Sequence, residues 1–287
     1  MIPVVVGSSP IGHPSFSPRK WRTPALGGRP SVRPAVAALF SAALAQVEIN
    51  ARGVARSADP EFLHQLRVGL RRLRTVQRAF RGVTPRRSAK PLKRALREFK
   101  PVLGTARDWD VFLAQSALPR EMLPVAQRKR AAAWRKARAA LSKRAFEQFL
   151  LRARRWARET PCRGSASTDI AASALTLFHR KTLKAARRVD WRNEKRRHAL
   201  RIRIRRLRYA CEFFASFSPR AQYTAYLKRV KALQDLLGEL NDIAVARRLL
   251  KEMKVEPAKQ LQRREARLIC AVGPAWAAFE RSRTFWG

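Results

Sequence analysis

Hydrophobic and polar positions follow a helical period over most of the chain, from Pro34 to about residue 283. Ala, Leu, Arg and Lys dominate this region, whereas glycine and proline occur only at widely spaced positions. Segments of this kind between such breaks are typical of α-helices, and no stretch alternates with the period of two expected of a half-buried strand. The sequence therefore predicts an all-α protein.

The spacing of the breaks predicts two sets of helices. The first set is expected at about residues 34–55, 60–82, 87–103, 106–117 and 121–159, with breaks at Pro60, Gly82, Gly104 and Pro119. The second set is expected at about residues 167–189, 193–217, 219–237, 239–254 and 257–283, with breaks at Pro219, Gly238 and Pro257. The two sets have nearly the same internal spacing, which indicates a repeat.

The two halves of the chain match each other at an offset of 134 residues without a gap. His64 corresponds to His198, Arg71 to Arg205, Phe80 to Phe214 and Asp108 to Asp242. Repeat one covers about residues 34–160 and repeat two about residues 167–283. Such a duplication predicts two similar helical bundles that face each other across a pseudo-twofold axis.

The charge of the chain indicates a polyanionic partner. Lys and Arg number 63 against 20 Asp and Glu, which gives a formal net charge of +43 at pH 7. Because 46% of the residues are hydrophobic, the chain can still build a sizeable core, and the excess charge must lie on a folded surface. Nucleic acid, anionic lipid and inorganic polyanions are the candidate partners.

The cysteines indicate the cellular compartment of the protein, and the composition of the N-terminal residues indicates whether they are ordered. Cys162, Cys211 and Cys270 form no paired motif, which argues against a disulfide framework or a zinc site and favours a reducing cytosol. No membrane span or export signal is expected. Residues 1–33 are rich in proline and glycine and are expected to form a flexible arm. Its basic residues either help to grip a polyanion or keep the arm solvated, and an acid-poor, Arg-containing start also resembles a transit peptide.

One basic motif occurs once in each repeat, His-x-x-Arg-x-x-x-Arg-Arg-x-Arg, at residues 64–74 and 198–208. At about 100° per residue, His64, Arg67, Arg71 and Arg74 cluster within about 80° on one helix face. Leucines such as Leu66 and Leu73 form a neighbouring apolar stripe. We therefore expect each motif helix to pack with one face and to present a cationic stripe with the next.

Phosphate is the ligand that best suits these stripes. Arginine makes bidentate, charge-assisted hydrogen bonds to phosphate and keeps its proton at any relevant pH. An ordinary solvated helix face would intersperse acidic residues, but residues 65–80 contain none. For His64 and His198, donation to phosphate and a structural role both remain open. A metal site is disfavoured because neither histidine is followed three or four residues later by a second His, Cys or carboxylate.

A second basic line is expected in repeat one and is matched in part in repeat two. Its residues are Lys93, Arg94, Arg97 and Lys100, with Lys228, Arg229 and Lys231 as the partial match. Asp108 and Asp242 each follow a glycine by four residues. We expect them to favour a helix N-terminus through the helix dipole or to hold a motif arginine in place.

At these residues the sequence resembles the CHAD family, the conserved-histidine α-helical domain. The resemblance rests on the duplicated basic motif and on a Leu-Gly-x-x-x-Asp segment at residues 103–108 and 237–242, and it covers about residues 34–283. It implies two four-helix bundles around a basic central cavity that binds inorganic polyphosphate, and an association with polyphosphate granules. The implied ligand-facing set is His64, Arg67, Arg71, Arg72, Arg74, His198, Arg201, Arg205, Arg206 and Arg208, with Arg94, Arg97, Lys228 and Lys231 as additions.

Nucleic-acid binding and catalysis are the two alternatives to polyphosphate binding. A nucleic-acid binder that ignores sequence is the main alternative, although the first stripe has no interleaved aromatic residues for base stacking. An enzyme that uses His64 or His198 is disfavoured, because the motifs lack a carboxylate cluster to hold Mg²⁺ on phosphates. The sequence also has no Glu-x-Glu-x-Lys strand motif of the triphosphate-tunnel domains that accompany some family members. We therefore expect a cytoplasmic, non-catalytic binding protein with no cofactor and no metal.

Overall fold

The computed structural model describes residues 17–26, 30–115, 118–163, 167–187, 189–217 and 220–286, and within these residues all regular structure is helical. The all-α prediction is confirmed. The α-helices are α1 (Val32–Arg56), α2 (Pro60–Ala79), α3 (Arg86–Gln115), α4 (Leu123–Leu141), α5 (Arg144–Glu159), α6 (Ser167–Ala186), α7 (Glu194–Phe213), α8 (Arg220–Glu252) and α9 (Lys259–Glu280). Two short 3₁₀ turns are at Arg120–Met122 and Ala215–Phe217.

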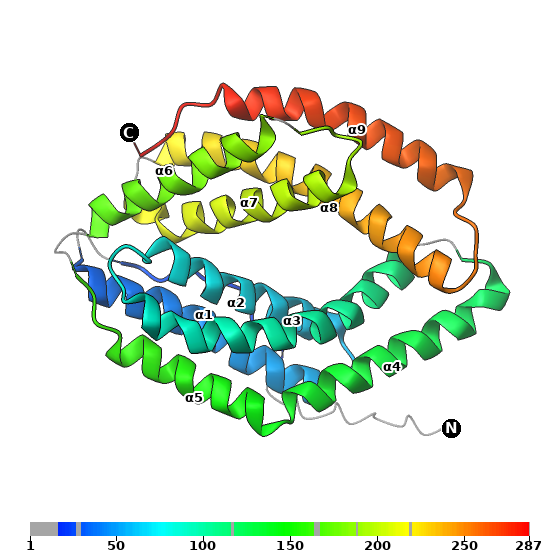
Figure 1. Cartoon of the computed structure of the whole chain (residues 1–287), viewed down its shortest axis with the longest axis horizontal. Coiled ribbons are helices and arrows are strands. Elements are labelled where there is room, and N and C mark those ends of the chain that lie inside the picture. The colour runs from blue at the N-terminus through cyan, green and yellow to red at the C-terminus, as the bar shows by residue number, and fades with distance from the viewer. Residues whose placement is uncertain are drawn as a thin grey trace, which may run out of the picture.

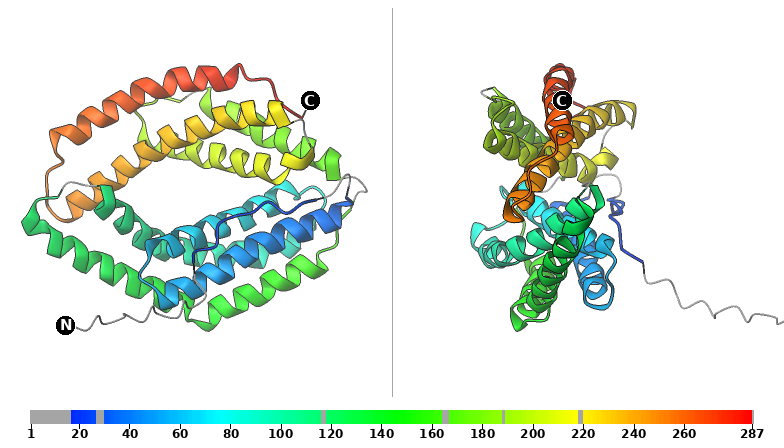
Figure 2. Two further views of the ribbon diagram at one scale, coloured as in Figure 1. Left: turned by 180° about the vertical axis from the view of Figure 1, so that it is seen from behind. Right: turned by 90° about the vertical axis from the view of Figure 1, so that its right-hand side faces the viewer.

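Helices α1–α5 lie on one side of the molecule and α6–α9 on the other (Figure 1). The two groups remain separate when the molecule is turned by 90° (Figure 2). Contacts between the groups come mainly from α2 against α7 and from α3 against α8, with smaller contributions from α6 against α1 and α2. The two helices that carry the basic motifs therefore meet where the two groups meet.

The core is one continuous apolar cluster that includes residues from every α-helix. Within the first group, α1 and α2 approach closely at Gly69. A Cβ atom at this position would lie 2.8 Å from Val47 Cγ2 and 3.3 Å from the carbonyl oxygen of Ala43. Any larger residue here would push the two helices apart, so the absence of a side chain permits their tight packing.

Helix α1 is the most apolar helix of the described chain. By length and composition alone it could cross a membrane, with a mean hydropathy of 1.4 over its most apolar window, half of which is buried inside the molecule. Leu39, Phe40, Ala43 and Val47 are almost completely buried. These side chains belong to the core between α1, α2 and α5, and their burial accounts for the apolar composition.

Two predicted helix breaks are wrong. Helix α3 runs through Gly104 and helix α8 runs through Gly238. A glycine inside a helix costs only about 1 kcal/mol relative to alanine. The burial of Leu103 and Leu237 in the core holds both helices across their glycines. Pro219, another predicted break, lies outside the described residues.

One predicted long helix is in fact two helices. The expected helix at 121–159 divides between Leu141 and Arg144, where Lys143 adopts an extended conformation with φ −73° and ψ 144°. No glycine or proline marks this corner. Leu141 and Phe146 are both buried on either side of it, so the chain bends to keep α4 and α5 packed on the same core.

Part of the predicted flexible arm is packed against the helices. The backbone N–H of Arg19 donates to Asn50 Oδ1 over 3.1 Å, and Asn50 Nδ2 donates back to the carbonyl of Arg19 over 2.9 Å. Thr23 Oγ1 donates to the carbonyl of Glu212 on α7 over 3.3 Å, and Leu26 is buried. Residues 19–26 therefore connect α1 with α7, whereas residues 1–16 and 27–29 of the predicted arm lie outside the described chain.

Candidate polyanion-binding site

The two motif helices begin and end in equivalent ways. Asp59 accepts a hydrogen bond from the N–H of Glu61 at the start of α2, and Asn193 accepts one from the N–H of Arg196 at the start of α7. At their other ends the buried rings of Phe80 and Phe214, which correspond to each other in the repeat, lie 5.7 Å apart in an edge-on contact. The caps define where each motif helix begins, and the contact between Phe80 and Phe214 joins the opposite ends of the two helices.

The centre of the site is formed by four arginines, two from each motif helix. Arg67 and Arg71 of α2 face Arg201 and Arg205 of α7 closely enough that their charges repel. Burial, followed by repulsion from Arg71, lowers the pKa of Arg67 to about 10. Burial, followed by repulsion from Arg71 and Arg201, lowers the pKa of Arg205 well below its ordinary value. We call these four residues the central cluster.

Carboxylates compensate only part of this charge. Asp108 lies near Arg67 and Asp242 near Arg201, and burial raises the pKa of each aspartate despite these arginines. Arg71 and Arg205 form no ion pair with any acidic residue of the described chain, and Nε of Arg71 is buried without a hydrogen-bond partner. The central cluster therefore has donors and charge available for an anion.

A second group of cations continues from the central cluster toward the C-terminal ends of α2 and α7. Arg206 is surrounded by Arg74, Arg78 and Arg203; burial and then their charges lower its pKa to about 9. Lys100 of α3 also lies near Arg74 and the central cluster, and its pKa is lowered by burial and then by these arginines. The motif residues Arg74 and Arg206 thus lie near each other.

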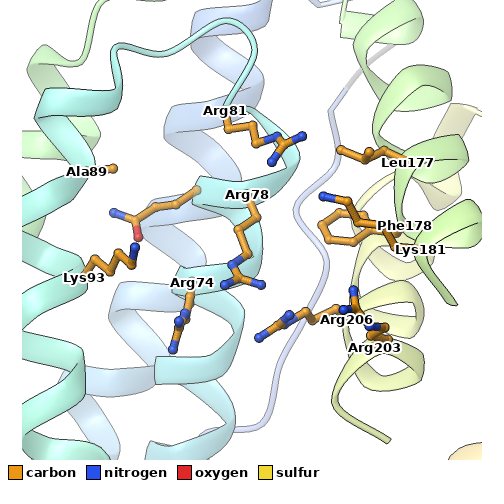
Figure 3. A pocket seen from close by; sticks show the side chains of 11 residues that line it. Arg74, Arg78, Arg81, Ala89, Lys93, Leu177, Phe178, Lys181, Arg203 and Arg206 are labelled. Atoms are coloured by element: carbon orange, nitrogen blue, oxygen red, sulfur yellow. The ribbon is translucent and has the colours of Figure 1, made fainter. Parts of the chain in front are cut away.

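These cations surround a pocket of about 320 Å³ between α2, α3, α6 and α7 (Figure 3). Its charged lining residues are Arg74, Arg78, Arg81, Lys93, Lys181, Arg203 and Arg206, and no carboxylate lines it. Four of these residues were not among the candidates predicted from the sequence: Arg78, Arg81, Lys181 and Arg203. Arg78 and Arg81 were detectable, since they follow Arg74 at the spacing of the stripe, whereas Lys181 comes from a helix without any motif.

Arg72 occupies a different environment from the other motif arginines. Its guanidinium lies 4.5 Å from the ring centre of Trp21 and 4.4 Å from that of Tyr209, and the residue is only 5% exposed. Its Nη1 lies 2.7 Å from Glu212 Oε2, and Arg208 Nε lies 3.5 Å from the other oxygen of the same carboxylate. The structure therefore gives Arg72 a structural contact and partly neutralises Arg208.

The two motif histidines lie at the other end of the site. His64 is half-buried, and burial followed by the charge of Arg107 lowers its pKa to about 4. His198 is exposed, with Nδ1 2.9 Å from Asn241 Oδ1; because this oxygen accepts, the proton lies on Nδ1 in this arrangement. Arg107 was not among the sequence candidates.

An ion pair joins the two halves near the histidines. Arg248 Nη2 of α8 donates to Asp108 Oδ2 of α3 over 2.8 Å. Two roles were expected for Asp108: to favour a helix N-terminus or to hold a motif arginine. The first is wrong, because Asp108 lies inside α3. Its hydrogen bond goes to Arg248 rather than to a motif arginine, while its charge still acts on Arg67.

The predicted second basic line is assembled into the site only in part: Lys93 lines the pocket and Lys100 lies near the central cluster, whereas the other members do not line the pocket. The Arg94 side chain is 87% exposed and lies 3.8 Å from Glu98, and exposed Lys228 and Lys231 border a separate hollow on α8 together with Asp235. Arg97 is also exposed, but it lies near enough to Arg74 to lower the pKa of that arginine, after burial. Among the described residues, no three His, Cys, Asp or Glu side chains form a group that could hold a metal ion.

Comparisons with known proteins place these features in a family. The family model of the CHAD domain matches residues 38–251. The crystal structure of the CHAD domain from the plant Ricinus communis is similar to this chain with a TM-score of 0.77 and 28% identity, covering 93% of this chain and 98% of that one. PptA from Streptomyces chartreusis has the same fold, with a TM-score of 0.65 and 15% identity over 88% of this chain and 99% of its own. No curated protein matches the chain.

Proposed function

Because this chain belongs to the CHAD domain family, we propose that it binds inorganic polyphosphate, without catalysis, in a basic cavity between its two halves. The observation that carries the proposal is the central cluster of Arg67, Arg71, Arg201 and Arg205. Two helices bring these arginines together although burial and mutual repulsion lower the pKa of several of them. An arrangement that weakens the free protein in this way is explained by a polyanion that neutralises it.

The cavity follows from the duplication. We propose that the halves are two related bundles about a pseudo-twofold axis that passes between α2 and α7. A residue near such an axis meets its own counterpart. The rings of Phe80 and Phe214 are in contact, and the charges of Arg71 and Arg205 interact, as do those of Asp108 and Asp242. These pairs all have the 134-residue offset of the sequence repeat.

The chemistry of the lining favours a chain of phosphates. Arginine forks form short, charge-assisted hydrogen bonds with phosphate oxygens, and cations one helical turn apart match a ligand whose charges repeat. Arg67, Arg71 and Arg74 provide such a row on α2, and Arg201 and Arg205 provide a second row on α7. Polyphosphate carries a charge on every unit and has no bases. Each phosphate unit along the chain can therefore pair with a cation of the lining.

Nucleic acid is the second candidate, since phosphate contacts alone can support binding that ignores sequence. The aromatic residues nearest to the motifs do not favour it. Trp21 and Tyr209 have Arg72 packed over their rings, and Tyr209 is almost completely buried. They are therefore not free to stack on bases, as proteins that bind single strands usually require.

We also propose that the protein binds polyphosphate in the cytoplasm, at polyphosphate granules.

Competition between the two polymers tests the proposal. Fluorescently labelled polyphosphate is bound to the full chain at near-physiological salt and displaced by unlabelled polyphosphate, DNA or RNA at matched phosphate concentration. We expect polyphosphate to displace the probe at a concentration at least about tenfold lower than either nucleic acid, a difference of about 1.4 kcal/mol.

Two variants locate the binding. Arg205→Gln should weaken binding of polyphosphate, whereas Arg135→Gln removes an equal charge from an exposed position on α4 and should not. Equal displacement by DNA would favour the nucleic-acid function. Equal losses in the two variants would indicate attraction to the overall charge and contradict a site at the central cluster.

A further inference from the structure

Four residues that line the pocket have chemically different counterparts in the other repeat. At the 134-residue offset, Gln77 corresponds to Cys211, Arg78 to Glu212, Arg81 to Ala215, and Arg203 to Gly69. In each pair the member that lines the pocket is a hydrogen-bond donor, and three of the four are cations. The counterpart in the other repeat is acidic, apolar or without a side chain. The duplication has therefore produced two unequal faces.

One face is closed. Glu212 forms ion pairs with Arg72 and Arg208, which neutralises the arginines that correspond to Arg206 and Arg74. Gly69 allows α1 to approach α2 where a side chain would collide with Val47. Trp21 covers the guanidinium of Arg72, and Thr23 is hydrogen-bonded to the carbonyl of Glu212. This face has little room or free charge for an anion.

The opposite face is open and carries the pocket. In Figure 3 the Arg206 side chain extends from α7 toward Arg74 and Arg78 of α2, and Lys181 from α6 lies on the same side as Arg206. Gln77 also lines the pocket; it is 7% exposed, and its Nε2 has no hydrogen-bond partner in the described chain. A buried donor without a partner costs stability unless a ligand accepts from it. Its counterpart Cys211 is buried on the closed face, where no such donor is needed.

We propose that this pocket binds the terminal phosphate of a polyphosphate chain, so that the protein recognises chain ends as well as chain length. The inference rests on the proposed function. A phosphate with one bridging oxygen carries about −1.5 to −2 charges at pH 7, because its second pKa is near 6, whereas a phosphate with two bridging oxygens carries one. The cations that line the pocket therefore favour the more highly charged phosphate at the end of the chain.

The shape of the pocket fits the end of a chain. A volume of about 320 Å³ is near the lower limit of small-molecule sites, which span about 300–1,000 Å³. Leu177 and Phe178 form an apolar part of its lining and offer no donor to a further phosphate. The rows of the central cluster lead to this pocket through Arg74 and Arg206, so a chain held by the cluster reaches it with one end.

Capped and uncapped polymers test the proposal. Polyphosphate of one defined length is prepared with free ends and with both terminal phosphates converted to alkyl phosphoramidates, which removes a charge and adds bulk at each end. Affinities for the full chain are measured by calorimetry at one salt concentration. We expect capping to weaken binding about tenfold, the effect of losing one or two charge-assisted contacts.

Variants assign the discrimination to the pocket. Arg78→Glu, which introduces the residue of the other repeat, and Arg203→Gln should weaken binding of the free-ended polymer and abolish the difference between the two polymers. Arg67→Gln should weaken both polymers equally and keep the difference. Circular dichroism and thermal unfolding check that each variant is folded. We expect no loss of stability in Arg78→Glu or Arg203→Gln, because both relieve repulsion.

The outcomes separate this inference from the proposed function. Equal affinity of the wild-type protein for capped and free ends would overturn end recognition while leaving polyphosphate binding intact. A capping effect that persists unchanged in folded Arg78→Glu and Arg203→Gln would also overturn the assignment to this pocket. Failure to bind either polymer would overturn the proposed function itself, and end recognition with it.

Discussion

Arg72 of α2 and Glu212 of α7 form a buried ion pair, with Nη1 2.7 Å from Oε2, between the two halves of the molecule. Arg72 corresponds in the sequence repeat to Arg206, which forms no ion pair within the part of the chain that the structure describes and faces Arg74, Arg78 and Arg203. The same motif position therefore holds the halves together on one face and contributes to a cationic pocket on the other. Their different surroundings predict opposite effects of the same substitution.

Arg72→Met should destabilise the protein by about 3 kcal/mol, because it leaves the Glu212 carboxylate poorly paired in a buried position. Arg208 remains near Glu212 and limits the loss. Arg206→Met should leave the free energy of unfolding unchanged or raise it, because it removes repulsion, and should weaken polyphosphate binding. Urea unfolding and a binding titration compare the two variants. Similar stability losses in both would contradict the assignment of different roles.

The fold class and the repeat were predictable from the sequence because both depend on periodic patterns. Helical spacing of leucines and an unbroken 134-residue offset need no three-dimensional information. Helix ends were less predictable, because they depend on tertiary burial. Gly104 and Gly238 lie inside helices whose neighbouring leucines are buried, and the corner at Lys143 has no local signal.

The site was predictable only as far as the motif extends. The structure brings the motif residues Arg67, Arg71, Arg201 and Arg205 near one another. The motif, however, treated Arg72 as equivalent to Arg206, although only Arg72 is paired with Glu212. The acidic partner of Arg72 comes from the other repeat, and the aromatic cover comes from the N-terminal segment. Lys181 could not be found because its role depends on how α6 packs, which no residue spacing within α6 reveals.

Neutralising the central cluster should stabilise the free protein and weaken its response to ligand. Arg205 is half-buried beside Arg71 and Arg201 and has no ion pair with an acidic residue of the described chain, so Arg205→Gln should raise the melting temperature in low salt. Added polyphosphate should raise the melting temperature of the wild-type protein more than that of the variant, because a ligand stabilises the state it binds. Differential scanning calorimetry with and without ligand measures both effects. A lower melting temperature in the free variant would mark Arg205 as structural.

The duplication predicts equal contributions from Arg71 and Arg205. The two residues correspond in the repeat and their charges interact. Arg71→Ala and Arg205→Ala should therefore weaken polyphosphate binding to similar extents, within about threefold of each other, a difference below 1 kcal/mol. Affinity measured at one ionic strength tests this, with helix content checked by circular dichroism. A loss confined to one variant would contradict a cavity shared by the two repeats.

Gly104 and Gly238, which correspond in the sequence repeat, provide a matched pair of substitutions. A Cβ at Gly104 would lie 3.0 Å from Nη1 of Arg67, whereas a Cβ at Gly238 would meet nothing within 4 Å. Gly238→Ala should therefore stabilise the protein by about 0.5–1 kcal/mol through helix propensity and leave polyphosphate affinity unchanged. Gly104→Ala should displace the Arg67 guanidinium and reduce affinity severalfold while the helix remains. Unfolding and binding measurements on both variants check this. Equal polyphosphate affinities in the two variants would show that binding does not require the present position of the Arg67 guanidinium.

His64 should make polyphosphate binding depend on pH. In the free protein burial, followed by the positive charge of Arg107, lowers its pKa from 6.5 to about 4, although Glu61 acts in the opposite direction. The unfolded chain therefore takes up a proton between pH 6.5 and pH 4 that the folded protein does not, and the stability contribution of His64 is lost as pH falls through this range.

Bound phosphate reverses this electrostatic balance at His64. It neutralises Arg67, Arg71 and Arg107 and favours the imidazolium, so the pKa of His64 rises on binding and a proton is taken up. Affinity should consequently increase as pH falls toward the free-state pKa.

Calorimetry at pH 6 in two buffers of different ionisation enthalpy measures this proton uptake on binding directly, and His64→Gln should reduce it. The terminal phosphates also titrate near pH 6, so the informative quantity is the difference between the wild-type protein and the variant. Equal proton uptake in the two proteins would mean that His64 does not change its protonation on binding, and would return this histidine to a structural role at the start of the motif helix.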